Sequence, residues 1–173
     1  MDNVKRQIGY ACPDTINGRI TGSGVRAAIL DTGAYPHPDF KGRVIGFADM
    51  QHGRCGLYDD SGHGTHVAGI LAGDGKMSGG RYAGMAPGVE LLIVKILDEK
   101  GEGNAMHILR GMEHVRKVHK KNKIALVNLS LGAGVGLDPV KENRITEAVE
   151  ELCNCGIAVV VSAGNYGLQS RKV

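Results

Sequence analysis

The 173-residue sequence contains no long hydrophobic run and no secretory signal pattern. A membrane-spanning helix needs about 20 consecutive apolar residues, so we expect no membrane span, and the lack of an export signal favours a cytoplasmic location. The four cysteines include no Cys-x-x-Cys pair, and Cys153-Asn154-Cys155 is too tightly spaced for a usual pair of zinc ligands. These features predict reduced thiols in a cytoplasmic protein.

The sequence also lacks the features of a nucleic-acid-binding protein. Its net charge is only +3, and most of the excess lies in the run Arg116-Lys117-Val118-His119-Lys120-Lys121-Asn122-Lys123. This run ends a predicted helix, where the helix dipole favours cations. No aromatic residues alternate with the cations and no binding motif accompanies them, so we expect no nucleic-acid partner.

Glycine, in contrast, is abundant, with 27 copies that cluster between apolar runs and therefore indicate tight connections. The apolar runs 25–30, 44–47, 89–97, 124–129 and 157–161 predict strands. Helical spacing predicts helices over 63–73, with Asp60-Ser61 in its cap region, from Asn104 to about 118, and from Pro139 to about 152. This alternation favours one α/β domain, a three-layer, doubly wound, mostly parallel sheet with helices on both faces.

Polar residues follow the ends of several predicted strands, where such sheets collect their functional groups. Asp31 follows the first strand, Ser130 the fourth and Asn165 the last, while His63 opens the first helix. A hydroxyl that attacks an amide needs a base, a carboxylate that orients the base, and a donor for the developing oxyanion. His63 could be the base, Asp31 the carboxylate and Asn165 the oxyanion donor.

The motifs resemble, in order and spacing over roughly residues 8–167, those of the subtilisin-like serine proteases. They are Ile29-Leu30-Asp31-Thr32-Gly33, His37-Pro38-Asp39, His63-Gly64-Thr65-His66-Val67-Ala68-Gly69, Gly84-Met85-Ala86-Pro87, Asn128-Leu129-Ser130-Leu131-Gly132 and Ser162-Ala163-Gly164-Asn165. The resemblance implies that Asp31 and His63 are two members of an Asp-His-Ser triad and that Asn165 is the side-chain oxyanion donor. It also implies a peptide substrate bound in extended form between Gly101-Glu102-Gly103 and Ser130-Leu131-Gly132.

The family's nucleophile lies in a Gly-Thr-Ser-Met/Ala turn, which these 173 residues do not contain. We therefore expect the N-terminal portion of the fold, with a lead segment over 1–23, a partial catalytic domain over 24–167 and a polar tail over 168–173. Such a fragment would be inactive alone and would expose sheet surface, which predicts self-association or a complementing C-terminal chain. The alternatives are a non-catalytic remnant that retains the peptide-binding cleft and one chain of a nicked two-chain protease.

Other chemistries fit the sequence less well. Asp31-Thr32-Gly33 also resembles the active-site triplet of aspartic proteases, but that class needs an all-β context and a second triplet. His63 and His66 could hold a metal, but the glutamate of a His-Glu-x-x-His site is absent. Ser130, Ser162 and Ser170 are interpreted as structural hydroxyls.

Calcium is the remaining candidate cofactor. Asp39 matches a position that some family members use for calcium, but the segment 73–80 lacks the ligand-rich loop that would complete the site. A turn or cap role is therefore predicted for Asp39, and no metal or other cofactor is expected.

Overall fold

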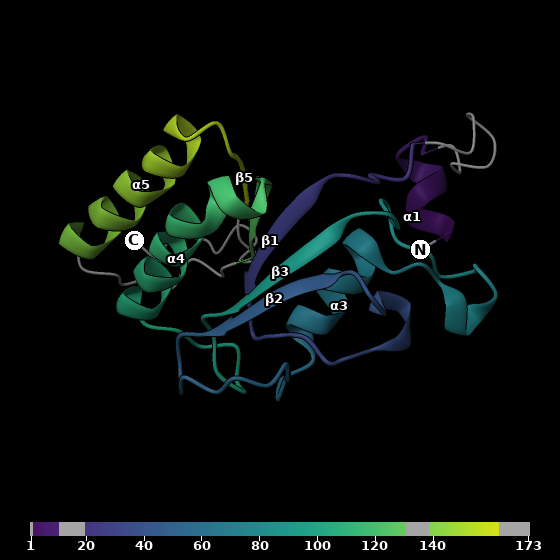
Figure 1. Ribbon diagram of the computed structural model, residues 1–173, viewed down its shortest axis with the longest axis horizontal. Helices are drawn as coiled ribbons and strands as arrows, with labels where there is room; N and C mark the ends of the chain where they lie inside the picture. The colour runs from purple at the N-terminus through teal and green to yellow at the C-terminus, as the bar shows by residue number, and fades with distance from the viewer. Residues whose placement is uncertain (1, 11–19, 131–138, 163–173) are drawn as a thin grey trace, which may run out of the picture.

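The computed structural model describes residues 2–10, 20–130 and 139–162. Within these residues, five strands form one parallel sheet in the order β2-β3-β1-β4-β5 (Figure 1). The strands are β1 (Arg26–Asp31), β2 (Val44–Asp49), β3 (Glu90–Lys95), β4 (Ile124–Leu129) and β5 (Ala158–Val161). The first strand in the chain thus lies at the centre, between two strands that come later.

Helices cover both faces of this sheet. The long helices α4 (Ala105–Asn122) and α5 (Pro139–Asn154) lie together on one face, and α3 (His63–Ala72) lies on the other (Figure 1). Shorter helices complete the described part: α1 (Asp2–Gln7) and the 3-10 turns η1 (Pro38–Phe40) and η2 (Lys76–Ser78). The predicted three-layer α/β architecture is confirmed. No helix in the described ranges is long and apolar enough to cross a membrane.

The core consists of two apolar clusters, one on each face of the sheet. Alternate residues of the central strand serve the two faces: Ala28 and Leu30 join the α4 and α5 cluster, whereas Ala27 and Ile29 join the cluster beneath α3. All four side chains are at most 2% exposed. A strand that is buried on both faces needs apolar residues at every position, which explains its continuous hydrophobic run.

Helix α4 begins and ends where its sequence provides the caps. Asn104 is the N-cap, and its side chain accepts a hydrogen bond from the backbone N–H of His107 at 2.9 Å. The helix ends at Asn122, and the C-cap residue after it, Lys123, adopts the left-handed conformation with φ 50°. Ile108, Met112 and Val115 on its inner side are buried against the sheet.

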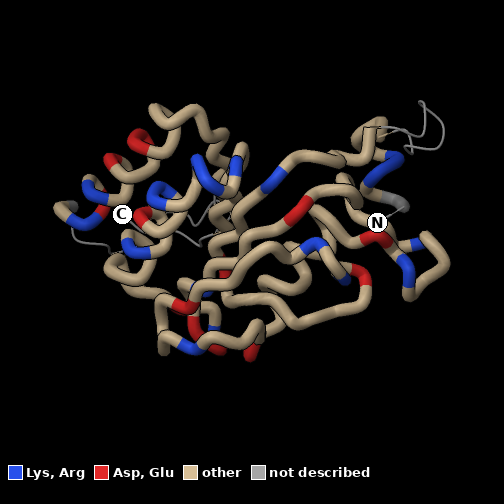
Figure 2. Tube along the Cα trace, viewed as in Figure 1, with Lys and Arg blue, Asp and Glu red and all other residues tan. Residues whose placement is uncertain are grey.

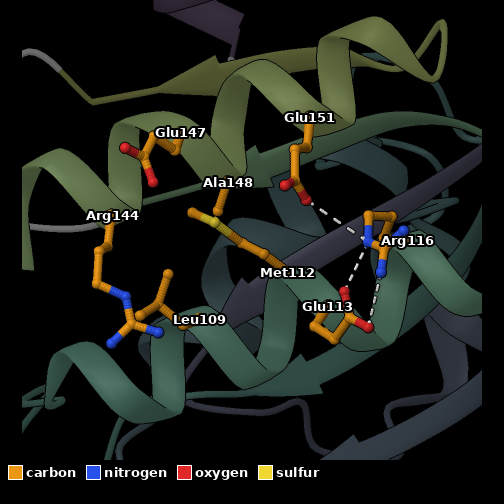
Figure 3. A pocket seen from close by; sticks show the side chains of 8 residues that line it. All are labelled: Leu109, Met112, Glu113, Arg116, Arg144, Glu147, Ala148 and Glu151. Carbon is orange, nitrogen blue, oxygen red and sulfur yellow. Dashed lines mark hydrogen bonds and ion pairs between the residues drawn. The ribbon is translucent and has the colours of Figure 1, made fainter.

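A cavity of about 200 Å³ lies between α4 and α5, on the face of the sheet away from α3. Leu109 and Met112 line it from α4, and Arg116 pairs there with Glu113 at 2.6 Å and Glu151 at 3.6 Å (Figure 3). Figure 2 shows charges of both signs on these two helices. The first cation of the basic run is therefore engaged in ion pairs within the protein.

Candidate active site

The carboxylate of Asp31 and the imidazole of His63 meet at the carboxyl end of the central strand. Asp31 ends β1 and is fully buried, while His63 is the first residue of α3. Asp31 Oδ1 lies 2.8 Å from His63 Nδ1 and also accepts the backbone N–H of Thr32 at 2.6 Å. The His63 side chain is 52% exposed, so one side of the ring is held by the carboxylate and the other is accessible.

Two glycines allow this close approach of helix and strand. A Cβ atom on Gly64 would lie 2.1 Å from the carbonyl oxygen of Gly33 and 3.1 Å from Asp31 Oδ1. A Cβ on Gly33 would lie 2.1 Å from the carbonyl oxygen of Tyr58, and Gly33 has φ 115°, which favours glycine. The glycines of the two strongest sequence motifs therefore set the distance between the acid and the base.

A second carboxylate, Asp59, holds the start of α3 against the loop after β1. It accepts hydrogen bonds from the hydroxyl of Thr32 at 2.9 Å, from the backbone N–H groups of Gly62 and Thr65 at 2.9 and 2.8 Å, and from the Thr65 hydroxyl. The sequence predicted Asp60-Ser61 as the cap region of this helix. The N-cap residue is instead Gly62, without a side-chain cap, and Asp59 binds the free N–H groups.

These contacts change the acidity of Asp59. Burial raises its pKa, but the hydrogen bonds from Thr65, Gly62 and Thr32 outweigh burial and lower the pKa from 3.8 to about 2. The ionised form is thus favoured in the folded protein. Asp59 stabilises the fold fully above about pH 4, and this contribution is lost as the pH falls through 2.

We expect Asp59→Asn to lower the free energy of unfolding at neutral pH and to flatten its decline between pH 4 and pH 2. The amide does not titrate, so the variant no longer loses this contribution on acidification. Urea unfolding at a series of pH values measures both effects. Asp74→Asn, at an exposed carboxylate that accepts the backbone N–H of Lys76 at 2.9 Å, is the matched control. An equal acid slope in Asp59→Asn and the unmodified chain would contradict the assignment.

Of the two predicted peptide-binding segments, the structure describes 101–103 in full and only Ser130 of 130–132. Gly101-Glu102-Gly103 is exposed and follows β3 in a turn, in which the backbone N–H of Asp98 donates to the Glu102 carbonyl at 2.8 Å. The backbone N–H of Glu102 donates in return to the Asp98 carboxylate and thereby lowers its pKa. Ser130 follows β4, and its hydroxyl accepts from the Asn128 amide at 2.7 Å, a structural contact. Leu131, Gly132, Asn165 and Ser170 lie outside the described residues.

Candidate metal ligands do not cluster in the described ranges. No group of three or more His, Cys, Asp or Glu residues there could hold a metal ion. Asp39 Oδ1 accepts the backbone N–H of Met77 at 2.9 Å, and the backbone N–H of Asp39 donates to His37 Nδ1 at 3.2 Å. Calcium requires several converging oxygen ligands, and the expectation that Asp39 holds no calcium stays a prediction.

Sequence reasoning missed two residues of the site, Asp59 and Lys95. Lys95 is fully buried at the end of β3, opposite Asp31 in the parallel register. A signal for it was present, since Lys95 is the one charged residue between Leu91 and Leu97 in a run that was predicted to be buried. Asp59 carried no such signal, because an aspartate in a polar loop is ordinary.

A buried aspartate that orients an imidazole, at the carboxyl edge of a doubly wound sheet, is an arrangement that activates a nucleophile in serine hydrolases. A model of the subtilase family, peptidase S8, matches residues 22–173. The chain belongs to this family of serine proteases.

Individual relatives agree with the family match. The chain is 43% identical over 162 residues to serine protease AprX of Bacillus subtilis, which covers 91% of this chain and 37% of AprX. It is 37% identical to subtilisin Savinase of Lederbergia lenta, over 91% of this chain and 54% of Savinase. The crystal structure of a cold adapted subtilisin-like serine proteinase matches with a TM-score of 0.67 and 28% identity, over 85% of this chain and 49% of that one. The chain thus spans roughly half or less of these relatives.

Proposed function

We propose that this chain supplies the acid–base half of a subtilisin-like serine endopeptidase, with Asp31 as the orienting carboxylate and His63 as the general base. The observation that carries the proposal is the 2.8 Å contact between the buried Asp31 carboxylate and His63 Nδ1. A carboxylate at Nδ1 favours the tautomer with its proton there, which leaves the lone pair on Nε2. The exposed side of the ring can then take the proton of an attacking serine hydroxyl.

The rest of the reaction follows from this arrangement. Proton transfer to His63 lets the serine oxygen attack the peptide carbonyl, and the imidazolium that forms is stabilised by Asp31. His63 then returns the proton to the leaving amine, and water repeats the sequence on the acyl-enzyme. Asn165, by resemblance, donates to the oxyanion, and the segments 101–103 and 130–132 bind the extended peptide by strand addition.

The 173 residues contain no serine in the family's Gly-Thr-Ser turn, so we propose that the chain alone is inactive and works with a segment that carries the nucleophile. Exposed apolar residues at the β5 edge support such a complementing chain or a second copy, since Val160 is 50% and Val161 56% exposed. A non-catalytic, peptide-binding remnant is the alternative, and a cytoplasmic location stays a prediction.

A fluorophosphonate probe tests the proposal, because it reacts only with a serine that an adjacent base activates. We expect no labelling of the 173-residue chain and labelling of the assembled protease, meaning this chain together with the segment that carries the serine. Heat-denatured samples control for non-specific reaction, and light scattering measures how many chains the labelled species contains. An assembled sample that binds peptides but takes up no probe would support the remnant instead.

A further inference from the structure

Lys95 is a buried cation whose surroundings are unusual for a lysine. It ends β3 with its side chain 0% exposed, although lysine is almost never fully buried without partners. Its ammonium nitrogen donates to the carbonyl oxygens of Thr32 at 2.7 Å and Leu97 at 2.8 Å, and to Asp60 Oδ1 at 2.6 Å. An ammonium group has three N–H donors, so these acceptors use all of them.

The three acceptors belong to three different parts of the candidate site. Thr32 directly follows Asp31, and Asp60 lies in the loop that leads into His63. Leu97 begins the turn that continues into the segment 101–103. One side chain therefore connects the loop of the acid, the loop of the base and the start of the predicted peptide-binding segment.

Other contacts fix Lys95 in this place. The backbone N–H of Ile96 donates to the carbonyl of Asp31 at 2.8 Å, which ties the ends of β3 and β1 together. The ring of Tyr58 lies 5.1 Å from the Lys95 nitrogen, a favourable cation–π distance. Tyr58 in turn donates to Asp49 at 2.8 Å. The ammonium thus has an aromatic neighbour besides its three acceptors, and that neighbour is bound to the last residue of β2.

We propose that Lys95 is a positioning residue that holds the Asp31–His63 pair in register with the segment 97–103. This inference rests on the proposed function but concerns a residue that the sequence motifs do not assign. A lysine suits the task because its three donors can hold two carbonyls and a carboxylate at once, whereas an apolar residue would fill the same space without binding any of them. A shift of either loop by about 1 Å would disturb the geometry on which catalysis depends.

The test uses the 173-residue chain and needs no hydrolysis, so its failure is distinct from failure of the proposed function. In Lys95→Met, which keeps an unbranched stem, we expect the His63 Nδ1 proton to exchange with solvent at least tenfold faster, as measured by NMR on ¹⁵N-histidine-labelled protein. Lys121→Met, at an exposed lysine of α4 outside the site, should leave the exchange unchanged.

A double variant, Lys95→Met with Asp60→Asn, separates positioning from simple charge burial. It leaves no unpaired carboxylate, so we expect its thermal stability to recover relative to the single variant. The proton exchange should stay fast, because the carbonyls of Thr32 and Leu97 are still unbound. Folded variants that exchange at the rate of the unmodified chain would overturn the proposal. Failure of both variants to fold would also overturn it, since Lys95 would then serve folding alone.

Discussion

Replacement of Asp31 by asparagine in the assembled protease is expected to lower kcat about 10⁴-fold with little change in KM. The asparagine side chain is nearly isosteric, so β1 and α3 should keep their places. It carries no charge to stabilise the imidazolium, and its NH₂ group favours the wrong tautomer of His63. Because Asp31 is fully buried, no water can substitute for the lost carboxylate.

Steady-state hydrolysis of a chromogenic peptide from pH 6 to pH 10 measures this effect. Asp74→Asn changes a carboxylate in the η2 loop, far from His63 in the chain, and should keep kcat within about twofold. Part of the lost activity should return at high pH, where hydroxide can take the serine proton that His63 in the wrong tautomer cannot accept. A kcat for Asp31→Asn within tenfold of the unmodified enzyme would show that this pair does not perform the proton transfer.

The second large effect is expected from Gly64→Ala, which adds one methyl group where strand and helix meet. Its Cβ would lie 2.1 Å from the carbonyl of Gly33, so α3 must move away from the loop after β1. Overpacking of this kind costs about 3 kcal/mol, and the melting temperature should fall by roughly 6–12 °C. The displacement also separates His63 from Asp31, so the protected Nδ1 proton should disappear from the NMR spectrum.

Gly69→Ala in the same helix is the matched control. A Cβ at Gly69 meets nothing within 4 Å, and alanine favours the helix by about 1 kcal/mol over glycine. This variant should therefore melt at the same temperature as the unmodified chain or slightly higher, with the His63 proton intact. Equal melting temperatures for the two variants would mean that the contact at Gly64 is not as tight as the structure indicates.

Much of the fold was predictable because each strand carries its own local signal. The apolar run 124–129 matches β4 residue for residue, and the runs 25–30 and 157–161 match β1 and β5 to within one residue. Glycine-rich connections bound these runs, and burial on both faces makes them continuously hydrophobic. The helix α1 was not predicted, because six polar-rich residues carry no clear periodicity.

The site was predictable only where single residues carry the chemistry. Asp31 and His63 follow from a strand end and a helix start, which local patterns locate. The contacts of Asp59 and Lys95 depend on which loops meet in space, and no sequence period records such meetings. The cap of α3 shows the same limit, since Asp59 rather than Asp60-Ser61 binds its N–H groups.

The central place of β1 has a consequence for the timing of synthesis. Of the five strands, β1 is synthesised first, yet it pairs with the later strands β3 and β4. The last residue of β4 is Leu129. About a hundred residues after Asp31 must therefore be synthesised before β1 can pair with strands on both sides. Such long-range pairing is slow. The aspartate and the histidine of the site are therefore synthesised well before the sheet that holds Asp31 in place can be completed.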